Sequence, residues 1–545
     1  MVFSIVTCCI LTLKPDVMKR TPASLIILLF SFLFTLSGYS QSLRKTVQDS
    51  PIYNGYTDVK DLYSPALEGN LQGNPSTQPV KVYLPPNYES FPDNQYPVVY
   101  LLHQFTTDYN LYFNEYGIVE KLDRLISQKA IKPLILVTPN AKTVYGGSWY
   151  TNTYVSGNWE DYITSDVFQH ITNNYHVLDQ RESRGMAGFS SAGYGTMNIA
   201  MKYPSKLGSI ATIGLGLVDM ELFFMNDPWE SWTIEAASIN EFRPGDPWYT
   251  HAIYSKAESF APDSTATPIL GRLPYTPEGE LIDSTWQEWM EHDPLTRIGI
   301  YKDSLIKLDT IQIYIGNQDD MHVPGHENLH QAMIDNGILH GYVTYSGGHD
   351  PGPVIEDILI YFSESLVSDV PTIRLLSEDS LKVGDTLVLK SDMNGSIYIV
   401  PDTDYQSIDS IIKYQVITTD VLADEEKEVY LSDIESGAYH VYTISNENMV
   451  SNIPEGFSII PTTIENKKIP SCEIYPNPVN DRLNIETNNP GYSYLLVSSI
   501  KGQLILSQEI EGTSHQIDLS TFQKGVYFIT IRSKDFVTTK KIIKL

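Results

Sequence analysis

A tight turn between an apolar strand and a helix constrains this chain more than any other stretch. The run at residues 184–187 predicts the end of a buried strand, and a helix is expected from Ala192 to about Tyr203. Between them, residues 188–193 (GFSSAG) place Ser190 among small residues, as in a nucleophile elbow. A small-x-Ser-x-small pattern alone is common, so its meaning depends on whether catalytic partners occur elsewhere.

Two residues further along the chain could complete a catalytic triad with Ser190. A serine hydroxyl is a poor nucleophile at neutral pH and needs a base, which in turn needs an acid to orient it. Asp319 follows the predicted strand Ile311–Ile315, and His349 follows the predicted strand Gly341–Tyr345. The carboxyl ends of parallel strands meet at one edge of a sheet, where the ligand crevice forms. The order Ser, Asp, His therefore predicts a triad.

Acyl transfer by a triad of this kind also needs two backbone N–H groups that stabilise an oxyanion. We assign them to Ser191, directly after the nucleophile, and to Phe105, which follows the predicted strand Val98–Leu102. Aromatic residues are dense before and within a later insertion, and they could either pack a core or form a wall that stacks on a sugar or aryl ring. The candidate pocket residues are His103, Gln104, Trp149, Tyr150, Trp159 and Phe189.

Alternating strand and helix patterns predict an α/β layered sheet over residues 79–368. Residues 41–78 are polar and are predicted to be an exposed lead-in. The insertion at about residues 214–309 interrupts the pattern where the crevice opens, so we expect it to cap the pocket. Other strands are expected at residues 80–84, 134–137 and 209–213, and other helices at residues 117–130, 160–175, 325–336 and 352–366.

Several segments of this domain carry a family resemblance. They read YPVVYLLHQF, NWEDYITSDVFQHI, MAGFSSAGYGTMNIAMKYPSKLGSI, GNQDD and YSGGHD. Over about residues 75–368 the chain resembles the esterase D-like family of α/β-hydrolases, which includes feruloyl and acetyl-xylan esterases, S-formylglutathione hydrolases, siderophore esterases and mycolyltransferases. The resemblance implies an α/β-hydrolase fold and the same three triad residues. Family members usually carry Gly where this chain has Gln104, and Gly-Gly where it has Ala192-Gly193.

The pattern changes near Pro371. Residues 371–461 lack helical periodicity and carry alternating runs separated by turn residues, which predicts a small immunoglobulin-like β-sandwich. A linker is expected at about residues 462–470, and residues 471–545 are predicted to be a second all-β domain. Strands of the first β domain are expected at residues 381–389, 396–400, 428–431 and 438–444.

The last domain carries a second set of spaced motifs. These are IYPNPV at residues 474–479, Gly502 in a turn, GVYF at residues 525–528 and KKIIK at residues 540–544. Together they resemble the C-terminal sorting domain of the type IX secretion system. That resemblance implies export across the outer membrane of a Bacteroidota-type bacterium, with the secretion machinery as partner, removal of the tail, and release or surface attachment. An ordinary β-sandwich accessory module is the alternative.

The N-terminus predicts a targeting segment. A basic pair precedes the apolar run at residues 25–36, and small residues at 38 and 40 suit a cleavage site. Residues 1–40 are therefore predicted to be a secretory signal peptide, with Met18 as a candidate true start. Because the apolar run is short, we expect no stable membrane span after processing.

Charge and cysteine content exclude other classes of function. The 545 residues carry a formal net charge of −29, which argues against binding of nucleic acid or of an anionic membrane surface. Three cysteines are too few for a disulfide framework or a cysteine metal site.

Residues 326–330 (HENLH) match the zinc-peptidase signature HExxH on a predicted helix, where both histidines would share one face. No third ligand is obvious beyond Glu356 or His349, and the helix occupies an ordinary position of the predicted fold. We therefore favour structural or surface roles for His326 and His330.

The sequence thus predicts a secreted serine esterase that hydrolyses carboxylic esters, with carbohydrate-linked feruloyl or acetyl esters as suitable substrates. No metal or organic cofactor is required for this chemistry. The alternatives are an acyltransferase with the same triad, a zinc peptidase acting through HENLH, which we disfavour, and a non-catalytic surface carbohydrate-binding protein.

Overall fold

The computed structural model describes residues 52–545 apart from residues 404, 406, 433, 452, 461–471, 488–492, 500–503 and 533–536. The predicted signal peptide, the linker and the Gly502 turn lie outside the described residues. The chain forms two compact units, of which the second consists chiefly of Ile459–Leu545. None of the helices in the described part of the chain is long and apolar enough to cross a membrane.

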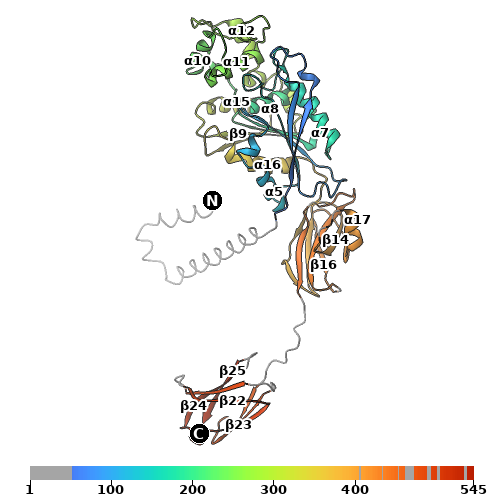
Figure 1. Ribbon diagram of the computed structural model, residues 1–545, viewed down its shortest axis with the longest axis vertical. Helices are drawn as coiled ribbons and strands as arrows, with labels where there is room; N and C mark the ends of the chain where they lie inside the picture. The colour runs from blue at the N-terminus through green and yellow to red at the C-terminus, as the bar shows by residue number, and fades with distance from the viewer. Residues whose placement is uncertain are drawn as a thin grey trace, which may run out of the picture. The chain divides into compact units, whose positions relative to one another are not determined.

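An eight-stranded sheet forms the centre of the first unit (Figure 1). Its strand order is β1-β2-β4-β3-β7-β8-β9-β10. The strands from β4 to β10 in this order are parallel, whereas β1 and β2 pair antiparallel at one edge. The strands are β1 (Tyr56–Tyr63), β2 (Thr77–Leu84), β3 (Val98–Leu102), β4 (Ile135–Pro139), β7 (Arg184–Phe189), β8 (Ser209–Ile213), β9 (Thr310–Gly316) and β10 (Gly341–Tyr345).

Helices cover both faces of this sheet, as the α/β prediction requires. On one face Leu122 and Leu359 pack in a cluster with Val99 of β3, and on the other Met197 packs in a cluster with Tyr100. Because β3 is buried on both sides, it forms an unbroken apolar run, which made it easy to predict. The first face carries α5 (Ile118–Ser127) and α16 (Ile355–Ser365), and the second carries α7 (Phe168–Asn174), α8 (Ser191–Lys202) and α15 (Val323–Asp335).

The predicted lead-in is wrong in part, because a strand near its middle belongs to the sheet. Residues 56–63 form β1, which pairs with β2 along its whole length. Most of its side chains are exposed, so the strand lacks the apolar signal that marks a buried one. After it, Ser64 and Leu67 are fully buried. Smaller elements of the domain are the 3-10 helices Pro65–Leu67, Arg181–Ser183 and Gly352–Val354, α4 (Leu111–Asn114), β5 (Asn152–Thr153) and β6 (Gly157–Asn158).

The helix expected at residues 160–175 is present but is not regular. It begins as α6 (Trp159–Asp161), continues as a π-helix at Tyr162–Val167 and ends as α7. The apolar periodicity of the sequence predicted the helical stretch and carries no signal for the wider turn.

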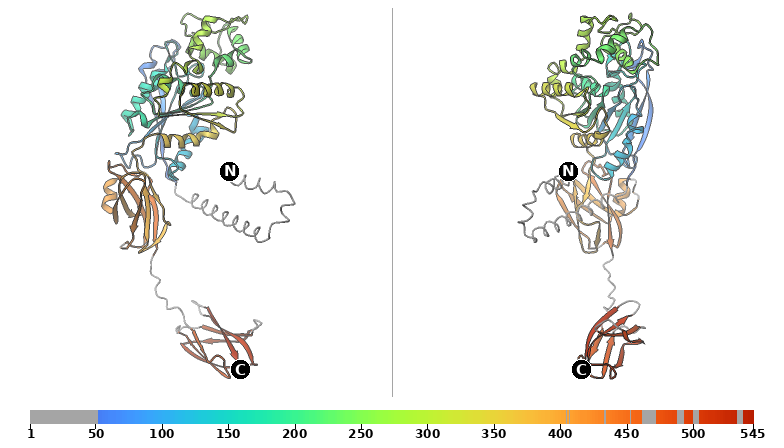
Figure 2. Two further views of the ribbon diagram at one scale, coloured as in Figure 1. Left: turned by 180° about the vertical axis from the view of Figure 1, so that it is seen from behind. Right: turned by 90° about the vertical axis from the view of Figure 1, so that its left-hand side faces the viewer.

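The insertion folds into short helices, which are α9 (Met220–Phe224), α10 (Trp229–Ala237), α11 (Trp248–Phe260), α12 (Asp283–Met290), α13 (Pro294–Arg297) and α14 (Lys302–Leu305). The last two helices of the insertion, α13 and α14, pack against α8 in the core of the α/β domain. The other four gather at one end of the domain (Figure 2). Aromatic side chains supply most of their packing, including Phe224, Trp229, Phe260 and Trp289, and Tyr194 of α8 joins this cluster.

Two sheets follow the α/β domain, ordered β11-β13-β16 and β12-β18-β17-β14-β15. The single strand predicted at residues 381–389 is instead two strands, β12 and β13, separated by a turn with Gly384 at φ 95°. A helix, α17 (Ile408–Tyr414), was not predicted, and a capping box of Ser407 and Ser410 starts it. The strands are β11 (Ile373–Leu375), β12 (Ser380–Lys382), β13 (Thr386–Ser391), β14 (Gly395–Pro401), β15 (Ile417–Val421), β16 (Glu426–Tyr430), β17 (Gly437–Ser445) and β18 (Glu455–Ile460).

This β region packs onto the α/β domain within the first unit. The Asn94 side chain donates to the carbonyl oxygen of Val450 and accepts from its N–H, each at 2.8 Å. Lys129 forms an ion pair with Glu455 at 2.7 Å.

The second unit consists of two sheets with the orders β19-β20-β23 and β22-β21-β24-β25. Their inner faces share one apolar core, to which Leu483, Val497 and Ile529 belong. The strands are β19 (Cys472–Tyr475), β20 (Arg482–Thr487), β21 (Ser493–Ser499), β22 (Leu504–Ile510), β23 (Ser514–Asp518), β24 (Gly525–Arg532) and β25 (Val537–Lys544). Alternating patterns in the sequence predict strands at residues 483–486, 493–499, 504–510, 526–532 and 538–545, so β19 and β23 were not predicted.

Candidate active site

Ser190 lies at the junction of β7 and α8 in a strained conformation, with φ 58° and ψ −121°. Few non-glycine residues adopt a positive φ, and such strain persists where the surroundings impose it. A Cβ atom on Gly188 would lie 2.2 Å from the carbonyl oxygen of Ala192, so glycine is required where strand and helix meet. The predicted elbow is therefore present in its geometry.

The structure brings the three predicted triad residues together. The Ser190 hydroxyl lies 2.9 Å from Nε2 of His349, and Nδ1 of the same ring lies 2.6 Å from Oδ2 of Asp319. Asp319 follows β9 and is 5% exposed, whereas His349 follows β10 and is 32% exposed. The ring of Phe189 packs against that of His349 at 4.6 Å. With Nδ1 protonated, Nε2 is free to accept the serine proton.

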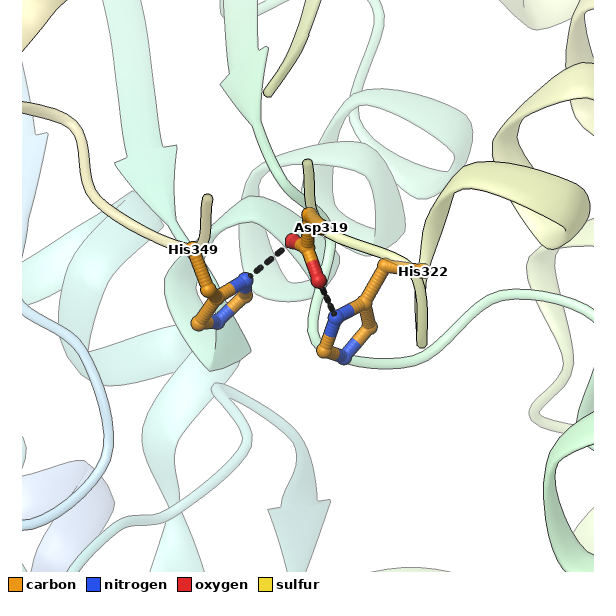
Figure 3. Close-up of side chains that lie close together, drawn as sticks. All are labelled: Asp319, His322 and His349. Carbon is orange, nitrogen blue, oxygen red and sulfur yellow. Dashed lines mark hydrogen bonds and ion pairs between the residues drawn. The ribbon is translucent and has the colours of Figure 1, made fainter. Parts of the chain in front are cut away.

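A second histidine binds the same carboxylate and was missed by sequence reasoning. Nδ1 of His322 lies 2.7 Å from Oδ1 of Asp319, so the carboxylate lies between two imidazoles (Figure 3). The rings of His322 and His349 stack at 4.4 Å. The available signal was the spacing Asp-x-x-His, which puts both side chains on one side of a turn.

Hydrogen bonds and burial act in opposite directions on the pKa of Asp319. Burial raises it, but the hydrogen bonds and charges of His322 and His349 outweigh burial and hold the pKa well below its usual value. Burial lowers the pKa of His322. Asp319 is therefore ionised, as the orienting acid of a triad must be.

The predicted oxyanion donors are the backbone N–H groups of Phe105 and Ser191, and the surrounding turns do not engage them in hydrogen bonds. Among the hydrogen bonds of the described residues, none has the N–H of Phe105 or Ser191 as donor to a loop or side-chain acceptor. A Cβ on Gly216 would lie 2.9 Å from both Ser190 Oγ and Ser191 N, so this glycine keeps the space beside them open. The loop residue with a positive φ is Thr106, at 68°, and not Gln104.

Two of the six pocket candidates, Gln104 and Trp149, line a cavity of about 410 Å³ that opens at Ser190. This volume is in the range of small-molecule sites. The lining residues are Gln104, Phe105, Thr106, Trp149, Ser190, Gly216, Phe223, Trp229, Trp248, Ala252, Lys256, Asp319, Met321, His322 and His349.

The other four candidates do not line the cavity, and each has a structural reason. His103 is buried, donates to the carbonyl oxygen of Gln104 and accepts from the N–H of Ala141 at 2.8 Å, while burial lowers its pKa to about 4. The Tyr150 hydroxyl donates to the carbonyl oxygen of His103. These two residues thus anchor the loop before Phe105. Trp159 is fully buried beside α7, and Phe189 lies behind His349.

The two histidines of the HENLH motif have separate hydrogen-bond partners in the fold. His326 accepts from the N–H of Leu215 at 2.9 Å, whereas His330 lies 2.7 Å from Nε2 of His340, so the two rings have different partners. Within the described residues, the one group of side chains spaced closely enough for a metal is Asp319, His322 and His349, and hydrogen bonds already account for that arrangement.

Comparison with known proteins assigns two parts of the chain to families. Residues 75–353, about half of the chain, match the Esterase family, described as "Putative esterase". The chain belongs to the esterase family. Residues 473–545 match the secretion system C-terminal sorting domain. Both resemblances stated from the sequence are confirmed.

Individual relatives of this esterase-family chain are distant. A segment of 139 residues is 30% identical to Esterase Rv1288 of Mycobacterium tuberculosis, covering 24% of this chain and 28% of that protein, so the chain spans less than a third of this relative's length. A solved ferulic acid esterase is 17% identical, with 58% of this chain and 100% of that chain covered and a TM-score of 0.41. FphF, a fluorophosphonate-binding serine hydrolase of Staphylococcus aureus, is 16% identical, with 57% and 99% covered and a TM-score of 0.40.

Proposed function

We propose that this chain is an exported serine esterase in which Ser190, His349 and Asp319 form the catalytic triad. The observation that carries the proposal is the continuous hydrogen-bond chain from the Ser190 hydroxyl through His349 to Asp319, at a cavity in an esterase-family domain. The C-terminal sorting domain supports export to the surface or exterior of a Bacteroidota-type bacterium.

The mechanism follows from the geometry. Ser190 Oγ attacks the ester carbonyl carbon while His349 Nε2 takes the hydroxyl proton, and the carbonyl oxygen becomes an oxyanion held by the N–H groups of Phe105 and Ser191. The alcohol leaves with the proton from His349, and an acyl-enzyme remains. Water then attacks the acyl group, His349 takes its proton and returns it to Ser190, and the acid is released.

The cavity wall supports a substrate with a flat ring. The cavity is lined by Trp149, Phe223, Trp229 and Trp248. Aromatic side chains therefore both pack the insertion and form part of the cavity wall. Such faces suit a sugar ring or an aryl acyl group. Together with export, this favours a carbohydrate-linked ester as substrate.

A fluorophosphonate probe tests the nucleophile directly. We expect the wild-type chain to hydrolyse 4-nitrophenyl acetate and to carry the label on Ser190 after peptide mapping, with no loss of activity in a chelator. A label on Ser191 would show that Ser191, and not Ser190, is the nucleophile. An unlabelled and inactive chain would reject the proposal, and chelator sensitivity would favour a metal-dependent reaction.

His322 is expected to act as a positioning residue for this reaction. His322→Phe keeps a ring against His349 and Phe223 but removes the hydrogen bond to Asp319, so kcat should fall roughly 5- to 50-fold with little change in KM. His322→Asn retains an N–H donor near the position of Nδ1 and should recover most of the lost kcat. Equal kcat values for the Phe and Asn variants would show that the hydrogen bond does not matter.

A further inference from the structure

Lys256 of α11 is a buried lysine that the proposed mechanism does not use. Lys256 is only 1% exposed. Its ammonium lies over the rings of Trp149 and Trp229, each at 4.4 Å, and over that of Phe224 at 5.5 Å. Its Nζ makes no hydrogen bond or ion pair with any of the described residues. Aromatic faces compensate the charge only in part. Since Lys256 lines the cavity, its Nζ is available to an acceptor on a bound ligand.

The lysine lines the same cavity as Ser190 and His349. Its charge helps to lower the pKa of His322, which places it within electrostatic reach of the triad. Trp149 is fixed beside it, since its indole N–H donates to Ser255 of α11 at 2.8 Å. The amine therefore lies in a cavity wall of packed aromatic side chains.

Among the described residues that line the cavity, none offers a free carboxylate to this amine. Asp319 is the one carboxylate among the described lining residues, and both its oxygens already accept from imidazoles. Burial alone lowers the pKa of Lys256 to about 7. A bound carboxylate would supply both the missing acceptor and the missing counter-charge.

We propose that Lys256 binds a carboxylate of the ester substrate, so that the enzyme prefers carboxylate-bearing esters to neutral esters of the same size. The inference rests on the proposed esterase function, because it places the scissile carbonyl at Ser190. The carboxylate can belong to the acyl group, as in a half-ester of a dicarboxylic acid, or to the alcohol, as in an acylated acidic sugar. Both sources present the same chemistry to the ammonium.

Two pairs of matched substrates distinguish these sources. Mono-4-nitrophenyl glutarate is compared with 4-nitrophenyl pentanoate for the acyl group, and 4-acetoxybenzoate with 4-acetoxybenzamide for the alcohol. We expect the wild type to favour the anionic member of one pair by roughly 10- to 100-fold in kcat/KM, mainly through KM. Absence of a preference in both pairs would overturn the inference.

The variant Lys256→Met assigns that preference to the lysine. Methionine keeps an unbranched side chain against the aromatic rings and removes the charge, so the ratio of kcat/KM between anionic and neutral esters should fall to about one. The control Lys302→Met removes an exposed lysine of the same insertion and should retain the wild-type ratio. An unchanged ratio in Lys256→Met would contradict the inference.

A measurement on the wild type avoids any folding defect of the variant. Monomethyl glutarate should inhibit hydrolysis of 4-nitrophenyl acetate at concentrations roughly 10-fold or more below those needed for neutral dimethyl glutarate. Equal inhibition by both would rule out a carboxylate site on the acyl side, and the same comparison of 4-hydroxybenzoate with 4-hydroxybenzamide as inhibitors tests the alcohol side. The two proposals fail separately: without Ser190 labelling and hydrolysis the esterase function is rejected, whereas hydrolysis without anionic preference rejects only the role of Lys256.

Discussion

Replacing Ser190 with alanine is expected to lower kcat for 4-nitrophenyl acetate by roughly four to six powers of ten. The substitution removes the oxygen that lies 2.9 Å from His349 Nε2, so no acyl-enzyme can form. The remaining rate would come from the oxyanion donors and substrate binding. Steady-state hydrolysis and fluorophosphonate labelling of the purified variant measure the effect.

The neighbouring serine provides the discriminating comparison. Ser191→Ala removes a hydroxyl but keeps the backbone N–H that we assign to the oxyanion hole, so its loss of activity should be far smaller than that of Ser190→Ala. If the two variants lose activity equally, or if Ser190→Ala retains more than about 1% of wild-type kcat, Ser190 is not the nucleophile.

Two of the strands that carry the triad were predictable because burial leaves a strong pattern. Ser190 follows β7 and Asp319 follows β9, and both strands are largely buried, so their residues read as nearly continuous apolar runs. His349 follows β10, which is only partly buried, and this strand was recognised from its place after a helix in the α/β alternation. By contrast, β1 is mostly exposed, and α17 is a seven-residue helix between strands. Neither shows a hydrophobic period long enough to recognise, so both were missed.

The triad itself could be predicted as positions in chain order, but its surroundings could not. Asp319 and His349 were found because each follows a strand, whereas His322 belongs to a turn whose geometry decides that both imidazoles reach one carboxylate. Lys256 was missed for a related reason. The stretch from Ala252 to Phe260 is buried throughout, so no apolar stripe on α11 indicates which side chains face the cavity.

This chain has Gln104 where family members usually have glycine, and the loop shows why a family pattern does not determine a local conformation. Glycine at that position would allow angles that are strained for other residues. In this chain the positive φ occurs two residues later, at Thr106, whose N–H donates to the carbonyl oxygen of Gly146 at 2.9 Å. The loop therefore keeps Phe105 beside the cavity without a glycine at residue 104.

Replacing Asp319 with alanine is expected to lower kcat about 10⁴-fold while KM changes little. The carboxylate accepts the Nδ1 proton of His349 at 2.6 Å, which leaves Nε2 as the base, and its negative charge stabilises the imidazolium that forms during attack. Because the pKa of Asp319 lies well below its usual value, the carboxylate stays ionised even at a pH below that usual value. Its contribution to catalysis is lost only as the pH falls through the lowered pKa. The deficit should therefore persist from about pH 5 to pH 9.

Two further variants separate this role from a general loss of structure. Asp320→Ala changes an exposed carboxylate in the same loop and should remain close to wild type. In the double variant Asp319→Ala/His322→Phe, kcat should be no lower than in Asp319→Ala alone, because His322 acts only through the carboxylate that is already missing. Additive losses would mean that His322 contacts the reacting groups itself, and a loss below about 10-fold in Asp319→Ala would remove Asp319 from the triad.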